Sequence, residues 1–264
     1  MRVVVFESAE SVTQFAADQV CRVIQTKNVP TLGLATGGTP LGLYRELIER
    51  HRKGLLSFKH VNSFNLDEYL GLSPDDDRSY HAYMRENLFK HIDIDLGHTH
   101  IPKTDRVDLD QSACEFEKAI ADCGGIDLQI LGIGSDGHIG FNEPGSSLAS
   151  RTRIKSLTQR TRADNARYFK CLDEVPKMAL TMGIGTIMES KSVMLLATGE
   201  SKAQAIRDTV EGPISAMVPS SILQMHPQTT LAIDTAAASS LKNIEYYLES
   251  EQNRVAQRTT VNIS

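Results

Sequence analysis

The sequence predicts an α/β protein with a doubly wound, mainly parallel sheet in a Rossmann-like three-layer sandwich. Two observations lead to this prediction. Short apolar runs alternate with amphipathic segments along the chain, and glycine-rich turns follow several of the runs. Strands that alternate with helices are typical of parallel sheets with right-handed crossovers. Because we find no internal repeat, low-complexity stretch or linker, we expect a single domain over residues 1–264.

The elements of the first half follow from apolar periodicity and capping residues. Residues 2–6 form an apolar strand, and Ser8 is placed to cap a helix that runs through residue 26. Pro40 suits the first turn of a second helix. The further elements expected here are strands at 31–35, 61–66 and 98–101, and helices at 40–53, 79–90 and 111–123.

The second half is expected to continue the same alternation. A polar stretch, residues 156–175, interrupts it after a basic strand. The expected strands are 126–131, 151–155, 193–197 and one near 231–233, and the expected helices are about 176–189 and 200–211.

Composition argues against several classes of function. The chain is 41% hydrophobic and 23% charged, as in ordinary globular proteins, and its net charge of −5 (pI near 5.9) disfavours a nucleic-acid partner. Its four cysteines lack zinc-finger spacing, which indicates reduced thiols in a cytoplasmic protein. No apolar run is as long as a membrane span, and residues 1–7 are typical of a strand, so we expect no membrane partner and no signal peptide.

One loop carries most of the chemistry that this sequence predicts. It follows the apolar run 126–131, contains four glycines, and holds three groups able to move protons, Asp136, His138 and Glu143. Loops at the carboxyl ends of strands hold the active sites of open α/β sheets. Taken together on one loop, these three residues favour catalysis.

Two other interpretations of this loop compete with catalysis. Gly132, Gly134 and Gly137 match a dinucleotide-binding fingerprint, but that fingerprint needs a helix at the glycines and an acidic residue about twenty positions later, and the sequence indicates neither. Alternatively, the loop is a plain turn in which the carboxylates act as caps and the histidine is structural.

A second loop is typical of an anion site. Thr36-Gly37-Gly38-Thr39-Pro40 lies between a strand and a helix, where glycines let N–H groups face a ligand and the helix N-terminus attracts an anion. Thr39 can cap the helix or bind directly, and a capped tight turn is the competing interpretation. A similar junction ends in Lys202 and adds a cation. Two such junctions favour a phosphate monoester as ligand.

Asp67 follows the third expected strand, beside Glu68, where a carboxylate can be a general base or a loop anchor. Residues 75–77 are three consecutive aspartates, but consecutive side chains point in different directions, so we interpret them as a solvated loop before an N-cap. His98 and His100 alternate in a short strand and are expected to be structural. The sequence therefore predicts no metal site.

Four motifs occur in order along the chain: Thr36-Gly-Gly-Thr-Pro40, Phe64-Asn-Leu-Asp67-Glu68-Tyr69, Gly134-Ser-Asp-Gly-His138-Ile-Gly-Phe-Asn-Glu143-Pro144 and Ser150-Arg-Thr-Arg-Ile-Lys155. Together they resemble glucosamine-6-phosphate deaminases, members of the glucosamine/galactosamine-6-phosphate isomerase family. The similarity runs from the first strand to Tyr246, and it implies conversion of glucosamine 6-phosphate and water to fructose 6-phosphate and ammonia without metal or redox cofactor.

The resemblance implies roles for particular residues. Asp67 would move the proton between C2 and C1, and His138 would open the sugar ring with support from Asp136 and Glu143. Residues 156–175 would form a mobile lid. The implied contacts to the substrate phosphate are Gly37, Gly38, Thr39, Arg167 and Lys202.

The family's allosteric members have a second phosphosugar site between subunits. In a strand, Arg151, Arg153 and Lys155 would share one face, where three cations require an anion or carboxylates; an ordinary solvated face is the alternative. We expect a homo-oligomer, with a hexamer favoured, activated by N-acetylglucosamine 6-phosphate. The residues matching this site are Ser146, Arg153, Lys155, Ser156 and Tyr246.

The departures from the family's pattern are local, and two other functions stay open at this point. Ala35 and Leu66 stand where proline and methionine are common, and the chain is compressed around residues 242–244, close to Tyr246. A 6-phosphogluconolactonase-type hydrolase would share this kind of fold but would not need Asp67 as a base. A phosphosugar-sensing repressor domain would carry a DNA-binding module before the first strand.

Overall fold

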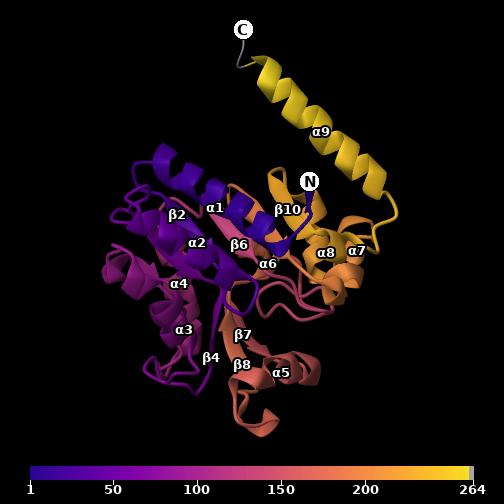
Figure 1. The fold of residues 1–264 in the computed structure, drawn as a ribbon. Helices are drawn as coiled ribbons and strands as arrows, with labels where there is room; N and C mark the ends of the chain where they lie inside the picture. Colours follow the sequence, from indigo (N-terminus) through magenta and orange to yellow (C-terminus); the bar gives the residue numbers. More distant parts are fainter. Residues whose placement is uncertain (262–264) are drawn as a thin grey trace.

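The computed structural model describes the backbone of residues 1–261 and the side chains of residues 1–257, around a central seven-stranded sheet (Figure 1). All neighbouring strands run parallel. In spatial order they are β1 (Arg2–Phe6), β10 (Thr229–Asp234), β9 (Val193–Ala197), β6 (Leu128–Leu131), β2 (Thr31–Leu34), β3 (Asn62–Asn65) and β5 (Thr99–His100). This order confirms the predicted doubly wound sheet.

Helices cover both faces of the sheet and complete the three layers. On one face lie α1 (Ala9–Thr26), α2 (Pro40–Arg52) and α3 (Tyr80–Asn87). On the other lie α4 (Leu109–Asp122), α6 (Ile184–Met188), α7 (Ala203–Val210) and α8 (Thr235–Ala238). Short 3₁₀ turns connect several elements: η1 (Phe89–His91), η2 (Leu96–His98), η5 (Glu200–Lys202) and η6 (Pro219–Met225).

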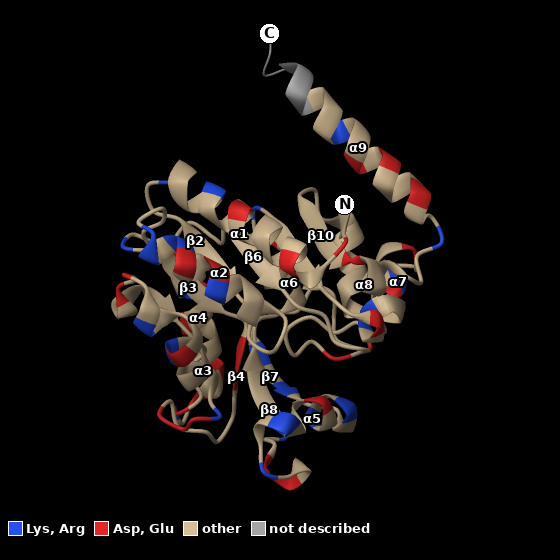
Figure 2. Cartoon of the chain, in the orientation of Figure 1, with Lys and Arg blue, Asp and Glu red and all other residues tan. Residues whose placement is uncertain are grey.

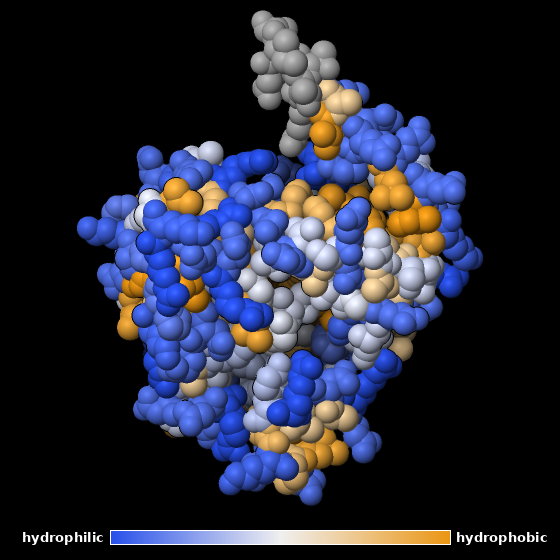
Figure 3. Space-filling model, in the orientation of Figure 1, coloured by the Kyte–Doolittle hydropathy of each residue, from blue (hydrophilic) through white to orange (hydrophobic). Residues whose placement is uncertain are grey.

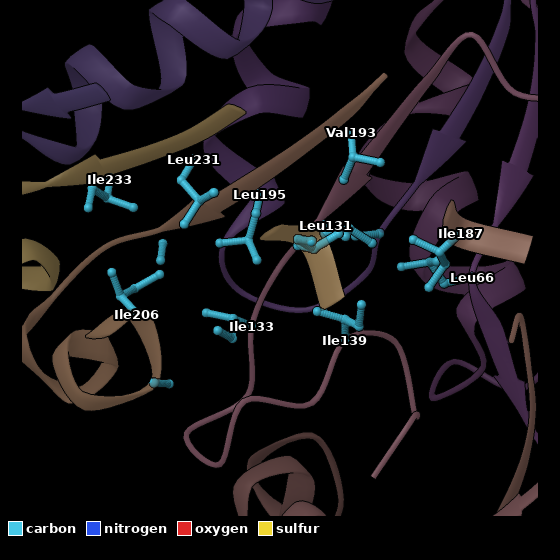
Figure 4. Close-up of a cluster of buried hydrophobic side chains, with 14 of the residues drawn as sticks. Leu66, Leu131, Ile133, Ile139, Ile187, Val193, Leu195, Ile206, Leu231 and Ile233 are labelled. Carbon is cyan, nitrogen blue, oxygen red and sulfur yellow. The ribbon is translucent and has the colours of Figure 1, made fainter. Parts of the chain in front are cut away.

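The core consists of two apolar clusters separated by the sheet. Successive side chains of a strand point to opposite faces, so Leu195 belongs to one cluster while Met194 and Leu196 belong to the other. Figure 4 shows the first cluster, in which Leu195 and Leu231 of the sheet face Ile206 of α7. Burial on both faces explains why these strands are continuous apolar runs in the sequence.

A second, smaller sheet lies beside the carboxyl ends of the large one. It is antiparallel, with β8 (Met178–Thr181) between β4 (Asp67–Tyr69) and β7 (Arg153–Ser156). The predicted helix over 176–189 is therefore wrong in its first half, and only its end, Ile184–Met188, is helical as α6. Residues 179–182 are all buried, which fits a strand paired on both sides and not an amphipathic helix. At Gly183 a Cβ would lie 2.1 Å from the carbonyl oxygen of Ser150, so only glycine fits at this position.

The segment expected to act as a lid (residues 156–175), called the lid segment from here on, extends from the small sheet. It contains α5 (Gln159–Asn165), η3 (Ala166–Tyr168) and η4 (Leu172–Glu174), and it lies at the bottom of Figure 1. Leu157 and Phe169 attach its two halves to a third apolar cluster that includes Tyr69 and Phe141. The lid segment is thus packed against the strand that begins with Asp67.

The last helix, α9 (Ile244–Val261), projects from the opposite end of the molecule (Figure 1). Arg2 of β1 forms an ion pair with Glu251 and attaches the helix to the sheet. Leu248 and Val255 are exposed, and Figure 3 shows hydrophobic side chains along this helix. None of the described helices is both long enough and apolar enough to cross a membrane.

Candidate active site

A cavity of about 150 Å³ opens at the carboxyl ends of β2 and β6. In the sheet, β3 and β5 follow β2 toward one edge, whereas β9 and β10 follow β6 toward the other edge. The direction in which strands are added therefore reverses between β2 and β6. Ligands of open α/β sheets bind at such a reversal. Both predicted loops and the lid segment line the cavity, which includes residues 37–39, Asp67, His138, Arg167 and Lys202.

The loop after β6 places a histidine between two carboxylates. Nδ1 of His138 lies 2.7 Å from Oδ1 of Asp136 and 3.8 Å from Oε2 of Glu143. Burial alone would raise the pKa of Asp136, but the hydrogen bond and charge of His138 outweigh burial and lower it to about 2. Glu143 is 2% exposed, and its Oε1 accepts a 3.0 Å hydrogen bond from the backbone of Thr158. Of the three residues, His138 is the one that lines the cavity.

The glycines of this loop make room for the histidine and do not open a helix. A Cβ at Gly134 would lie 2.1 Å from the His138 ring, and Gly137 adopts a φ of +84° that other residues rarely take. Residues 132–152 contain no helix. The dinucleotide interpretation is therefore wrong, because its phosphate site needs the N-terminus of a helix at these glycines.

Asp67 is 5% exposed, at the start of β4. Burial, followed by the charge of Glu68, raises the pKa of Asp67 to about 8, against the effect of hydrogen bonds from the backbone of Phe141 and the side chain of Thr181. A Cβ at Gly140 would approach Oδ2 of Asp67 to 3.2 Å, so the loop passes close to this carboxyl group. A carboxyl group that titrates near neutral pH in a cavity can take up a proton and return it.

The other end of the cavity is suited to an anion. Gly37 turns the chain with a φ of +96°, and the side chain of Thr39 makes no capping hydrogen bond to α2. The N–H groups of the first turn of α2 are thus left for a ligand. Lys202 of η5 and Arg167 of the lid segment bring two cations to the same place. This geometry can hold a phosphate group while the sugar carbons extend toward the two catalytic candidates.

Comparison with known proteins agrees with this arrangement. Residues 6–232 match the family described as glucosamine-6-phosphate isomerases/6-phosphogluconolactonase. The chain belongs to this family. It is 54% identical over 260 residues to the glucosamine-6-phosphate deaminase of Cellvibrio japonicus, with 98% of this chain and 99% of the relative covered. It is 51% identical over 257 residues to that of Hahella chejuensis, with 97% and 98% covered.

The family description covers both deaminases and lactonases, and solved structures of the two kinds differ in how similar they are to this chain. A monomeric glucosamine-6-phosphate deaminase superposes with a TM-score of 0.89 at 48% identity, covering 91% of this chain and all of that one. A 6-phosphogluconolactonase from Thermotoga maritima reaches a TM-score of 0.69 at 18% identity, covering 89% and 99%. At that identity the likeness shows a shared fold alone.

Three of the candidate catalytic residues lie close enough together to hold a metal ion. Ligand atoms of Asp136, His138 and Glu143 lie within 4.8 Å of one another. Two of these atoms, Nδ1 of His138 and Oδ1 of Asp136, are hydrogen-bonded to each other. The expectation of a metal-free site stays a prediction. The three aspartates at 75–77 lie in a loop before Ser79, which caps α3 as predicted.

The residues matched to an effector site fall in two places. On β7, Arg153 donates to Oδ1 of Asn142 at 2.9 Å, and its Nη2 is buried without a hydrogen-bond partner among the described residues. The buried Ser146 donates its N–H to the carbonyl oxygen of Glu143. Lys155 and Ser156 also lie on β7, where Figure 2 shows basic residues. Tyr246 lies in the first turn of α9, where it lines a cavity with Arg2 and Thr229 at the amino ends of the strands of the large sheet.

The basic strand begins later than predicted, at Arg153 and not at residue 151. Arg151 precedes the strand, and its guanidinium pairs with Glu117 at 2.8 Å and with Glu189 at 2.6 Å. Two carboxylates therefore satisfy this cation, which is one of the two ways expected for a row of cations to be neutralised. The prediction that Arg151 belongs to the strand is wrong. Lys155 is left with Arg153 on the less exposed side of β7.

Sequence reasoning missed three residues that line the cavity: Tyr80, Asp164 and Asn165. Tyr80 stacks near Phe141, and its backbone N–H donates to Glu68. These positions carry no distinctive motif. The pattern Ser79-Tyr80 marks a helix start, and residues 164–165 stand in a polar segment, so only the folded chain brings them to the site.

Proposed function

We propose that this protein is a glucosamine-6-phosphate deaminase, a deaminating aldose–ketose isomerase of amino-sugar catabolism. It converts glucosamine 6-phosphate and water to fructose 6-phosphate and ammonia. The observation that carries this proposal is that Asp67 and His138 line the same cavity as the cations Arg167 and Lys202. A base, an acid and a phosphate anchor therefore surround a space of the size of a small ligand.

The reaction needs two proton transfers that these residues can perform. His138 takes the proton of the anomeric hydroxyl and delivers a proton to the ring oxygen, which opens the pyranose. Asp136 holds the imidazole in one tautomer, and Glu143 adds negative charge beside it when the ring is protonated. Asp67 removes the proton from C2 and returns it to C1, while a proton passes from the amine to O1, so that C2 becomes an imine. Water adds to this imine and releases ammonia, which leaves the ketone at C2. Neither a metal nor a redox cofactor takes part in this proposal.

The phosphate anchor and the lid segment supply orientation. Gly37, Gly38 and Thr39 present N–H groups and a hydroxyl to the phosphate, so that binding energy at one end of the sugar fixes C1 and C2 against Asp67. The lid segment, residues 156–175, is proposed to move, and its closure keeps water from the enol-like intermediate. Arg167 on this segment makes closure dependent on the phosphate.

The test measures ammonia released from glucosamine 6-phosphate by the purified protein, with hydrolysis of 6-phosphogluconolactone measured in parallel. The deaminase proposal requires ammonia in stoichiometric amounts with fructose 6-phosphate. Lactone hydrolysis without ammonia would favour the 6-phosphogluconolactonase-type alternative. Binding of phosphosugars without turnover of either substrate would favour the third candidate, a phosphosugar-sensing regulatory domain.

We further propose a homo-oligomer, with a hexamer favoured, that N-acetylglucosamine 6-phosphate activates. Support comes from Arg153 and Ser146, each of which has a buried polar atom with no hydrogen-bond partner among the described residues. Arg153 also donates to Asn142, next to Glu143, and Ser146 donates its N–H to the carbonyl oxygen of Glu143, so an effector phosphate there would act on the catalytic loop. Lys155 and Ser156 complete the cluster on β7. Because Tyr246 lies at the other end of the chain's fold, it can join this cluster only from another subunit.

Exposed apolar side chains on α9, such as Leu248, support association between chains. A monomeric deaminase among the similar structures makes the solution mass the deciding measurement. A cytoplasmic location is part of the proposal and is supported by four free cysteines.

A further inference from the structure

The cavity beside His138 adjoins a second cavity of about 820 Å³, which lies against the first turns of α1 and α2. The residues that line both cavities mark the junction between them. They are Gly38, Thr39, Asp164, Arg167 and Lys202. Four of these are the groups proposed to hold the substrate phosphate. The fifth is a carboxylate, which repels phosphate.

Asp164 lies in the last turn of α5, on the lid segment. Its Oδ2 accepts a hydrogen bond from the hydroxyl of Ser135 at 3.3 Å, and that hydroxyl accepts from Nε of Arg160 at 3.0 Å. Ser135 immediately precedes Asp136 in the catalytic loop. The lid segment is therefore tied to the catalytic loop, and the tie holds the Asp164 carboxylate at the phosphate end of the site.

The charges around Lys202 show what this carboxylate does there. Burial lowers the pKa of Lys202 most, and the cations Arg167 and Arg160 lower it further, whereas Asp164 and Asp136 act in the opposite direction. Of these two carboxylates, Asp136 is already engaged by His138. Asp164 is thus the acidic group that is free to offset the clustered cations of the phosphate subsite.

We propose that Asp164 is a counter-ion that the lid segment carries into the phosphate subsite, where it competes with the phosphate of the substrate for Arg167 and Lys202. When a phosphate dianion enters, Asp164 either moves away or stays and repels it, and both responses weaken binding. Asp164 therefore limits the affinity for phosphate esters and favours reopening of the lid segment after the reaction. This inference rests on the proposed function for the nature of the substrate.

The decisive variant is Asp164→Asn, which keeps the size of the side chain and an oxygen that can accept from Ser135 but removes the charge. We expect it to bind inorganic phosphate roughly threefold to tenfold more tightly, because one charge close to a dianion is only partly screened by salt. The gain should shrink as salt is raised to about 1 M, where the Debye length falls to about 3 Å. The KM for glucosamine 6-phosphate should fall in parallel.

Calorimetric titration of inorganic phosphate into each protein makes the test independent of turnover. The matched control is Asp173→Asn, because Asp173 carries the same charge on the same lid segment but lines neither cavity. Ser135→Ala removes the hydroxyl that ties the lid segment and leaves the Asp164 charge in place. We expect no gain in phosphate affinity from Asp173→Asn. From Ser135→Ala we expect a smaller gain than from Asp164→Asn, because the carboxylate loses its tie but keeps its charge.

Equal phosphate affinities in Asp164→Asn and Asp173→Asn would overturn the proposal. An equal gain in Ser135→Ala would also overturn it, because release of the lid segment and not charge would then explain the effect. A wild-type protein that binds no inorganic phosphate would overturn it as well. If the protein binds phosphate but releases no ammonia, the deaminase proposal fails while the counter-ion proposal is still decided by the titrations.

Discussion

Nδ1 of His138 lies 2.7 Å from Oδ1 of Asp136, whose pKa is lowered to about 2 by this contact despite the opposing effect of burial. Asp136 thus stays ionised at all pH values of interest and accepts a hydrogen bond from Nδ1–H. The imidazole is left with Nε2 for the substrate. This orientation makes His138 suitable for relaying a proton between two oxygens of a sugar ring.

His138→Gln should lower kcat/KM more for the cyclic sugar than for an analogue that is already in the open-chain form, because ring opening is the step assigned to the imidazole. The measurement compares kcat/KM for the two compounds. Asp136→Asn should show the same selective loss, since it acts through the imidazole tautomer. Equal losses on both compounds would remove the ring-opening assignment and leave His138 as a general acid–base.

Asp67→Asn should keep the fold and the binding of phosphate esters but lower turnover by at least about 10²-fold, the low end for loss of a general base. Exchange of the substrate C2 proton with solvent should disappear with it. Both are measured on purified protein, the second by deuterium incorporation. Near-normal turnover in this variant would exclude Asp67 from the mechanism.

The raised pKa of Asp67 predicts how stability depends on pH. The unfolded carboxyl ionises near its ordinary pKa of 3.8, whereas the folded one does so only near 8. Between these values the unfolded state binds fewer protons, so this group lowers stability increasingly as pH rises from about 4 to about 8.

Asp67→Asn removes this penalty, and its Tm should exceed that of the wild type at pH 8 by at least about 4 °C, the effect of about 2 kcal/mol in a chain of this size. The difference should vanish toward pH 4. Thermal unfolding at several pH values provides the measurement, and a difference that does not change with pH would contradict the raised pKa.

Chelation should leave ammonia release unchanged. Asp136, His138 and Glu143 are close enough to share an ion, but the proposed chemistry uses these groups to hold and move protons. The enzyme is assayed after dialysis against EDTA and again after addition of Mg²⁺, Mn²⁺ or Zn²⁺. Activity that is lost with EDTA and restored by one of these ions would assign a metal to the three residues.

Lys155→Ala should abolish activation by N-acetylglucosamine 6-phosphate and leave turnover at saturating substrate nearly intact, because Lys155 lies on β7 and does not line the cavity. Rate is measured against substrate with and without effector, together with the mass in solution. The wild-type curve should change from sigmoidal toward hyperbolic, since an effector favours the state with higher substrate affinity. A monomer with hyperbolic kinetics and no response would defeat the proposal of regulation.

The sequence by itself determined the large sheet, because strands buried on both faces are continuous apolar runs and the helices between them show amphipathic spacing and capping residues such as Ser8. It also determined the loops that hold Gly38 and His138, since glycines after strands mark close approach of the backbone to a ligand. Local patterns suffice for such features because neighbours in the chain produce them.

Only the tertiary structure decided the small antiparallel sheet, because the buried residues 67–69 and 179–181 are too few and too uniformly buried to show a period. The tertiary structure also decided the ion-pair partners of Arg151, which come from α4 and from the end of α6. It likewise decided that Asp164 lines the same cavity as Lys202. These contacts join residues far apart in the chain. Their energies depend on burial and on distances between charges, which exist only once the chain has folded.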